Sequence, residues 1–218
     1  MVAEGVFSTG EIGSYCTVDD VLALLASYDL SGLGDSEQIA ARVNGALPAA
    51  MEAVEALADR DFDYHQAAVV RVNGSGTDTL SLAESGAVPI IDIAAVTVNG
   101  RNLDSSRLVV GSDEASLRML PRGRAREVFA RGKLNVEVVL DWGFTAPPSD
   151  ICTAQAKLAA AEILASMAGL EGTAESVRIG DYEARYGAGG ALGAAILALT
   201  ESARRIAGRY WRMSVGAV

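Results

Sequence analysis

The spacing of apolar residues changes twice along this chain, and the two changes restrict it to one fold class. Apolar residues recur every three or four positions up to about residue 64, alternate with other residues from 66 to 144, and return to helical spacing after residue 147. A period near 3.6 indicates an amphipathic helix, whereas a period of two indicates a strand with one buried face. Helices on either side of a run of strands predict an α+β fold, in which the later helices pack against the earlier ones.

Two helices are predicted before the strands. Thr17 is a suitable N-cap, since acidic residues follow it and apolar residues continue at helical spacing as far as Tyr28. After a linker around residues 31–35, a longer helical pattern spans residues 39–57 and contains Pro48. Proline lacks a backbone donor and clashes with the preceding turn, so we expect Pro48 to kink this helix or split it in two.

The middle of the chain predicts about half a dozen strands. The pair Asn99-Gly100 tolerates the positive φ angles of a tight turn, so a hairpin is expected there. The clearest strand has four apolar residues that alternate with its other residues and should face the core: Leu134, Val136, Val138 and Leu140.

A third helix is predicted to begin at Pro147-Pro148-Ser149-Asp150, because proline is tolerated in a first turn and an acid there complements the helix dipole. Its expected apolar stripe is Ile151, Ala154, Leu158, Ala161 and Ala165. A short extended piece at 177–179, a tyrosine-bearing loop at 181–190 and a last helix from Leu192 to Tyr210 should follow.

These elements predict a small helical bundle with an inserted antiparallel β region. The bundle is expected to comprise residues 15–64 and 147–212, the β insertion residues 65–146, and a C-terminal tail residues 213–218. Three large apolar residues flank the passage from strand to helix and are expected in a core that joins the β insertion to the helices: Trp142, Phe144 and Ile151.

The composition of the chain argues against DNA-binding and membrane-spanning proteins. The chain has 218 residues, of which 50% are hydrophobic, which is enough for a domain-sized core. Its net charge of −10 would repel a phosphate backbone, so tight DNA binding is disfavoured. The first ten residues lack the pattern of a signal peptide, and no stretch reaches the roughly 20 apolar residues that cross a bilayer. We therefore expect a protein made in the cytoplasm, with no membrane partner and with Cys16 and Cys152 reduced.

No catalytic or metal site is predicted. His65 is the only histidine, and at the exit of the second helix it is expected to be solvated or to cap a turn. One histidine and two remote cysteines make no transition-metal cluster. Asp59, Asp61 and Asp63 alternate near His65, but the glycine and final glutamate of a calcium loop are missing. No cofactor is expected either.

A glycine-rich run, residues 187–193, precedes the last helix and resembles a phosphate cradle. However, the third glycine of a dinucleotide motif would fall at Leu192, and no strand-helix-strand unit surrounds the run. A flexible loop is the favoured interpretation. A small nucleotide-binding enzyme that uses this loop is the alternative from another functional class.

Basic residues gather in two places, around residues 118–133 and at the end of the chain, where Tyr210 and Trp211 join them. The interpretations are charged, solvated ends of elements, anchors at a protein interface, where Arg, Tyr and Trp are enriched, and, third, contact with nucleic acid. Residues at the C-terminus are the first candidates for an interface with a partner protein or a neighbouring copy: Arg204, Arg205, Arg209, Tyr210, Trp211, Arg212 and Met213. The secondary candidates are Arg122, Arg124, Tyr182 and Tyr186.

Four stretches in order resemble the head-tail connector family of tailed bacteriophages. They are residues 49–62, which end in Arg60-x-Phe62, then residues 88–100, residues 136–151 and residues 179–186. The resemblance covers most of residues 15–212. Residues 112–131, a basic turn in the β region, have no counterpart in it, and their role stays open.

The resemblance implies a structural virion protein of the neck and no enzyme. It implies a head-to-tail adaptor, expected as a dodecameric ring between the portal protein and a tail-side neck or tail-terminator protein. DNA would pass through the channel that the ring extends, without tight binding. Another neck or tail-completion protein with the same build is the remaining alternative.

The end of the chain is expected to dock onto the portal, and the alternative is a tail folded back on its own subunit. Residues 210–218 begin with bulky anchor types and continue without a helical stripe. A free terminus of this composition is usually mobile until a partner orders it.

Overall fold

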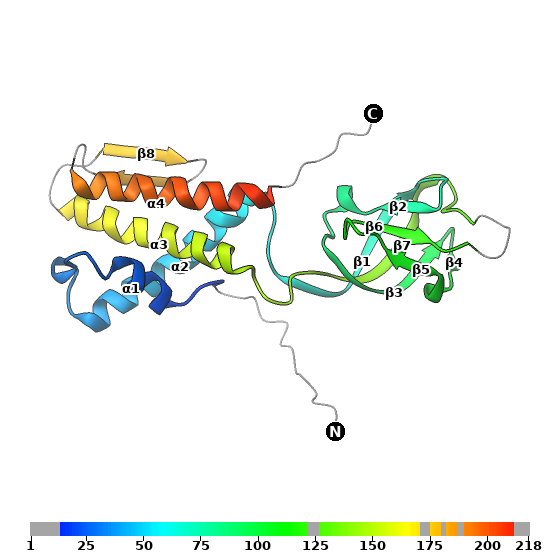
Figure 1. Cartoon of the computed structure of the whole chain (residues 1–218), viewed down its shortest axis with the longest axis horizontal. Helices are drawn as coiled ribbons and strands as arrows, with labels where there is room; N and C mark the ends of the chain where they lie inside the picture. Colours follow the sequence, from blue (N-terminus) through cyan, green and yellow to red (C-terminus); the bar gives the residue numbers. More distant parts are fainter. Residues whose placement is uncertain (1–13, 122–126, 171–174, 180–181, 187–189, 212–218) are drawn as a thin grey trace, which may run out of the picture. The chain divides into compact units, whose positions relative to one another are not determined.

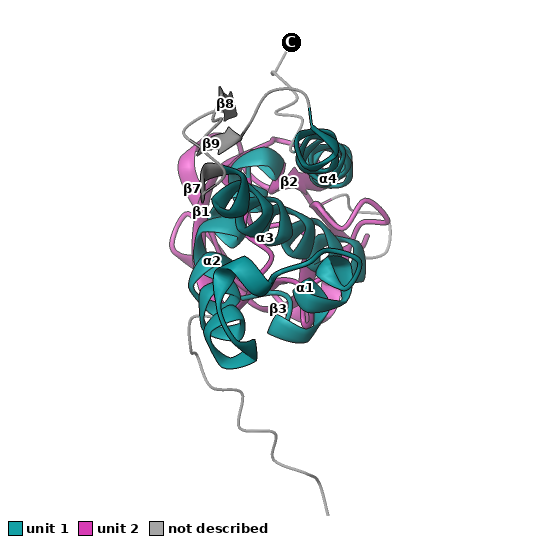
Figure 2. Ribbon diagram, turned by 90° about the vertical axis from the view of Figure 1, so that its left-hand side faces the viewer, with its two compact units in different colours: residues 1–59, 148–211 teal, residues 60–147, 212–218 magenta. Residues whose placement is uncertain are grey.

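The computed structural model describes residues 14–121, 127–170, 175–179, 182–186 and 190–211. Figure 2 shows two compact units, one from residues 1–59 and 148–211 and the other containing residues 60–147. The helices belong to the first unit and the two main antiparallel sheets to the second, which confirms the predicted α+β class.

The helical unit contains four α-helices (Figure 1). They are α1 (Val18–Leu25), α2 (Ser36–Ala58), α3 (Ser149–Leu170) and α4 (Ala191–Ala207), with short 3-10 turns at Ser31–Leu33 and Gly208–Tyr210. A hairpin of β8 (Glu175–Ile179) and β9 (Tyr182–Tyr186) lies between α3 and α4 in the chain. The predicted loop at 181–190 is therefore wrong in part, because residues 182–186 pair with β8 as an antiparallel strand.

Both N-terminal helices begin with a reciprocal capping box. Thr17 and Asp20 form the first, and Asp35 and Gln38 form the second, each pairing side chain with backbone in both directions. Helix α2 is continuous through Pro48, so the predicted split is absent. Buried residues on both sides of Pro48, including Val43 in the first half, pack the whole helix into the unit and offset the lost hydrogen bond.

Helix α3 is the centre of the helical unit, since α1, α2 and α4 all pack against it. Every residue of its predicted apolar stripe is buried: Ile151, Ala154, Leu158, Ala161 and Ala165. The helix also buries one polar side chain, Gln155, which is 0% exposed. Its Oε1 accepts from the backbone N–H groups of Tyr15 (2.8 Å) and Cys16 (2.9 Å). Its Nε2 donates to Leu47 O (2.9 Å) and Ser14 Oγ (3.0 Å).

The second unit is built from two antiparallel sheets. The larger has the order β1 (Tyr64–Gly74), β7 (Gly132–Gly143), β3 (Ile90–Val98) and β4 (Arg101–Asn102). The smaller has the order β2 (Thr79–Ser81), β6 (Ser116–Met119) and β5 (Leu108–Val110). Residues of both sheets share one hydrophobic core, with Val136, Val138 and Leu140 of β7 fully buried. The hairpin at Asn99-Gly100 is confirmed, with φ angles of 50° and 76°.

The prediction that Leu134 faces the core is wrong. Leu134 is 57% exposed and has a φ of 47°, because the pairing of β1 with β7 is irregular between Val72 and Gly74. Such an irregularity changes the alternation of faces at that end of the strand. Asn73 Oδ1 accepts the Leu134 N–H at 2.8 Å and holds the backbone there.

The three residues expected in one joining core fall in different units. Ile151 is fully buried in the helical unit. Trp142 packs against the hydrophobic core of the β unit, and Phe144 packs against Phe62 with ring centroids 5.5 Å apart. Each unit therefore has its own core on its side of the junction.

Candidate interface at the end of helix α4

The end of α4 is attached to the start of α3. After the helix, a 3-10 turn carries Tyr210, whose hydroxyl donates to Asp150 Oδ1 at 2.7 Å. Arg209 Nη1 lies 3.9 Å from the other carboxylate oxygen of Asp150. Because Asp150 is in the first turn of α3, these contacts hold the turn against the central helix. Tyr210, expected to dock on a partner, is thus bonded within its own chain.

The next residue points its large side chain toward solvent. Trp211 is 57% exposed, and its backbone N–H lies 3.4 Å from Gly208 O. The Arg209 side chain is 70% exposed despite its approach to Asp150. A tryptophan and an arginine that are both exposed at a fixed position have the composition of a binding hot spot.

Two further arginines lie on the last turn of α4. Arg204 is exposed and pairs with Glu201 at 3.0 Å, one helical turn earlier. Arg205 is exposed and forms no ion pair with another described residue. Cations in this position are favoured by the helix dipole. Together with Arg209 they form what we call the basic face: Arg204, Arg205 and Arg209.

Several predicted interface residues lie outside the described part of the chain. They are Arg122, Arg124, Arg212 and Met213. Tyr182 and Tyr186 are the end residues of β9, and the structure describes their backbone pairing alone. Near the basic turn of residues 112–131, Arg107 forms an ion pair with Glu127 and donates to Leu120 O at 2.7 Å.

The glycine-rich run at 187–193, predicted as a loop, lies partly in helix α4. Gly190 is the N-cap of α4, and Gly193 is buried inside the helix. Residues 187–189 lie outside the described part of the chain. Gly193 therefore packs in the core of the helical unit and is no part of a loop.

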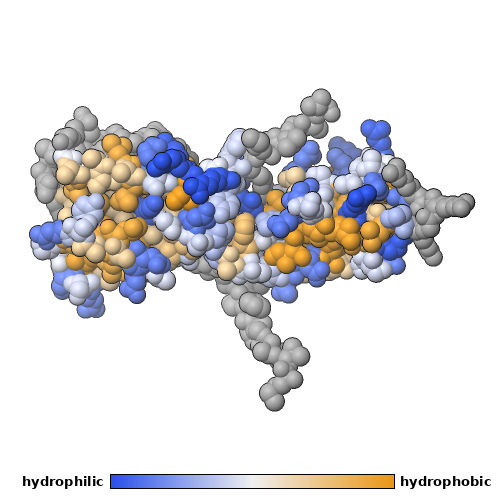
Figure 3. Space-filling model, in the orientation of Figure 1, coloured by the Kyte–Doolittle hydropathy of each residue, from blue (hydrophilic) through white to orange (hydrophobic). Residues whose placement is uncertain are grey.

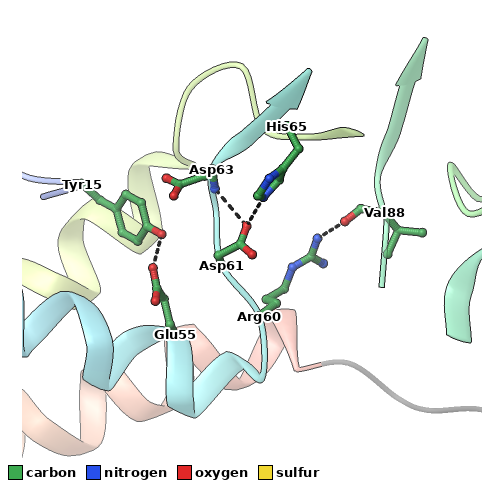
Figure 4. Close-up of polar contacts among 7 residues, drawn as sticks. All are labelled: Tyr15, Glu55, Arg60, Asp61, Asp63, His65 and Val88. Carbon is green, nitrogen blue, oxygen red and sulfur yellow. Dashed lines mark hydrogen bonds and ion pairs between the residues drawn. The ribbon is translucent and has the colours of Figure 1, made fainter. Parts of the chain in front are cut away.

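The sequence did not predict a cluster of contacts around Arg60, which involves Phe62, Phe144 and Val88 and which we call the clasp. Figure 4 shows part of it. The Arg60 guanidinium lies over the rings of Phe62 (5.8 Å) and Phe144 (5.2 Å) and donates to Val88 O. The side chain thus contacts the two segments that enter and leave the unit, and the segment before β3. The Arg60-x-Phe62 pattern was the one sequence signal for the clasp, but the second aromatic ring, Phe144, is more than 80 residues away in the sequence.

The histidine beside this clasp has partners on two sides. His65 Nε2 lies 2.9 Å from Asp61 Oδ1, and its ring stacks on Trp142 at 3.9 Å with 13° between the planes. Within the described ranges, no group of three or more His, Cys, Asp or Glu residues is placed to hold a metal ion. Neither Cys16 nor Cys152 belongs to a disulfide between described residues, and burial raises the pKa of the Cys16 thiol to about 11.

Asp63 lies two residues before His65, and burial disfavours its charged form. Desolvation is the largest cause that raises its pKa above the ordinary 3.8, the charge of Asp61 adds to it, and His65 opposes it. The buried Oδ1 of Asp63 has no hydrogen-bond partner among the described residues. Ionised Asp63 therefore destabilises the folded β unit.

Asp63→Asn is expected to raise the melting temperature at neutral pH. The folded-state pKa is above the unfolded one, so the unfolded chain ionises first as the pH rises, and the cost to folding is complete above the folded-state pKa. Below about pH 3 both states are protonated, and the variant and wild type should melt alike. Melting curves across this range test the prediction, with Asp92→Asn on the exposed part of β3 as the control for lost charge. An equal gain at every pH would contradict it.

No protein-family model and no curated protein matches this chain. None of the described helices is both long and apolar enough to span a membrane. The chain is similar to a chain in the virion of the native gene transfer agent particle, with a TM-score of 0.47, 18% identity and 96% of each chain covered. It is also similar to a chain in the neck of the native particle with C12 symmetry, with a TM-score of 0.41, 14% identity, and 94% of this chain and 97% of the other covered.

Proposed function

We propose that this chain is a structural subunit of the neck of a phage-like particle, and no enzyme. More closely, we propose a head-to-tail adaptor that forms a ring between the portal and the tail and extends the DNA exit channel. The observation that carries the proposal is the end of α4, where Trp211 and Arg209 are exposed at a position held by the bond from Tyr210 to Asp150. Such residues on a preorganised support suit a protein interface.

The architecture supports the same proposal. Residues before and after the β unit both contribute to one helical unit, so the β unit is an insertion, as the resemblance to head-tail connectors implies. In this proposal the bundle of residues 15–64 and 147–212 carries the ring contacts, and residues 213–218 form a tail that reaches the portal. The net charge of −10 suits a channel through which DNA must slide without binding.

The proposal is tested by measuring the size of the purified chain with and without the portal protein of its own particle. A ring that forms with the portal, and thermal stability unaffected by nucleotides, are the expected results. A monomer or dimer that ignores the portal and gains thermal stability from a nucleotide would instead support the enzyme alternative, because a ligand specific to the native state must stabilise it.

Trp211→Ala is expected to weaken binding to the portal by about 2 kcal/mol, or roughly 30-fold, because an exposed aromatic anchor would lose its contacts with a partner pocket. Deletion of residues 211–218 should abolish co-sedimentation with the portal. The melting temperature should stay unchanged in both cases, since Trp211 is exposed and Tyr210, which bonds to Asp150, is retained.

The control for this experiment is Val69→Ala, which removes an exposed apolar side chain from the β unit. It should bind the portal as wild type does. If the truncated chain joins the particle with normal occupancy, the docking of this end is wrong. If it unfolds, the segment has a structural role within the subunit.

A further inference from the structure

Helix α4 presents a face that the other described residues leave exposed. The basic face, Arg204, Arg205 and Arg209, is exposed at the C-terminal end of the helix. Earlier on the same helix, Leu197 is 46% exposed. In residues 190–211 the only acidic residue is Glu201, so this end of the unit has a net positive charge in a chain whose total is −10.

The opposite charge gathers in the N-terminal part of the same unit. Residues 14–41 contain five acidic residues and neither lysine nor arginine. All five are exposed, and we call them the acidic face: Asp19, Asp20, Asp29, Asp35 and Glu37. Hydrogen bonds from Thr17 lower the pKa of Asp20, and hydrogen bonds from Ser31 lower that of Asp29. Asp20 and Asp29 therefore keep their negative charge at neutral pH.

The two faces are carried by helices on different sides of α3. Helices α1 and α4 both pack against α3, and in Figures 1 and 2, which share a vertical axis, α4 lies above α3 and α1 below it. A subunit with complementary surfaces on opposite sides can bind one neighbour with each. That is the requirement for a heterologous, head-to-tail interface, which closes into a ring when the rotation between neighbours allows it.

We infer that the basic face of α4 docks onto the acidic face of α1 and the start of α2 in a second copy of this chain. The inference deepens the proposed function, on which it rests, by naming the surfaces through which the ring closes. A second copy is the occupant because it offers five carboxylates to three arginines that have one acidic neighbour on their own helix and one, Asp150, on α3. Arginine favours such planar, multidentate contacts to carboxylates. The apolar surface of Leu197 would be covered by the same contact.

DNA is the other polyanion that a basic face could bind, and the charges argue against it. The acidic face would repel DNA, whereas it attracts the arginines of a neighbour. Space-filling atoms in Figure 3 show hydrophilic and hydrophobic residues side by side on the visible face of the helical unit, as in a mixed protein interface. Assembly through charged faces should also weaken as salt rises.

Two charge-reversed variants of the full chain test the inference. Arg204→Glu with Arg205→Glu reverses the basic face, and Asp19→Arg with Glu37→Arg reverses the acidic face outside the capping boxes. Each variant alone would bring like charges together at every contact between copies. We expect each to associate about a hundredfold more weakly than wild type, because like-charge juxtaposition at an interface is strongly unfavourable.

The decisive measurement is on an equimolar mixture of the two variants. In the mixture every contact between unlike subunits again joins opposite charges, so rings of alternating subunits should form, and a chain carrying all four changes should also assemble. Sedimentation velocity, with the portal added where wild type needs it, measures these sizes, and melting curves show that each variant is folded. Arg101→Glu with Arg118→Glu, on exposed positions of the β unit, is the control for the variant of the basic face, since it changes the net charge by the same amount, and it should assemble as wild type does.

The outcomes separate this inference from the function on which it rests. If wild type assembles and either variant assembles equally well alone, or if the mixture fails to assemble, the inference is overturned and the neck function stands. If wild type forms no ring with or without the portal, the proposed function and the inference both fail.

Discussion

Gln155→Met is expected to lower the free energy of unfolding of the helical unit by on the order of 4 kcal/mol. Methionine has a similar volume, so the variant removes hydrogen bonds without opening a large cavity. The backbone N–H groups of Tyr15 and Cys16 both donate to Gln155 Oε1 in a fully buried place. Each would lose its partner, and leaving a buried donor unsatisfied costs about 1–3 kcal/mol.

The effect should be concentrated where Gln155 joins three segments. Its amide connects residues 14–16, α2 through Leu47 O, and α3 itself. Amide hydrogen exchange is therefore the suitable measurement, since it should show lost protection in α1 and α3 while the β unit keeps its protection. Gln66→Met, at an exposed position in β1, is the matched control and should change stability by less than about 0.5 kcal/mol. A loss of under about 1 kcal/mol for Gln155→Met would show that water replaces the amide.

Phe62→Ala is expected to destabilise the β unit by about 3–5 kcal/mol, the usual cost of removing a buried phenylalanine ring. Phe62 is 0% exposed, packs against Phe144 and lies beneath the Arg60 guanidinium. Its loss would leave a cavity and weaken the clasp that Arg60 forms with Phe144 and Val88 O. The effect should therefore exceed that of truncating either half-buried partner.

Denaturant unfolding combined with hydrogen exchange of the β1 and β7 amides measures this loss. Phe144→Ala is the comparison, and it should cost less because Phe144 is only partly buried. Phe62→Leu, which fills part of the cavity, should recover part of the stability. Equal effects of Phe62→Ala and Phe144→Ala would show that the clasp depends on the aromatic pair and not on the burial of Phe62.

Local pattern was sufficient to predict the four helices and the fold class. The change from helical to alternating spacing placed strands between helices, because each periodicity follows from backbone geometry within a few residues. The turn at Asn99-Gly100 followed from the φ angles that these residue types tolerate, and the buried stripe of α3 from its apolar spacing. Pro48 does not split α2, because buried residues on both sides of it keep the helix continuous. Leu134 shows where a local rule failed, since a register irregularity in the β1–β7 pair exposes it.

Only the tertiary structure decided which polar and aromatic side chains meet. Tyr210 and Asp150 are 60 residues apart, and their hydrogen bond turned an expected docking residue into the support of Trp211. Gln155 lies among the alanines of α3, where spacing gives no sign that it bonds to segments more than 100 residues away. The placement of opposite charges on α1 and α4 likewise depends on how both helices pack against α3. Sequence periodicity specifies which face of an element is buried, whereas partners far apart in the chain are set by three-dimensional packing that a local pattern does not contain.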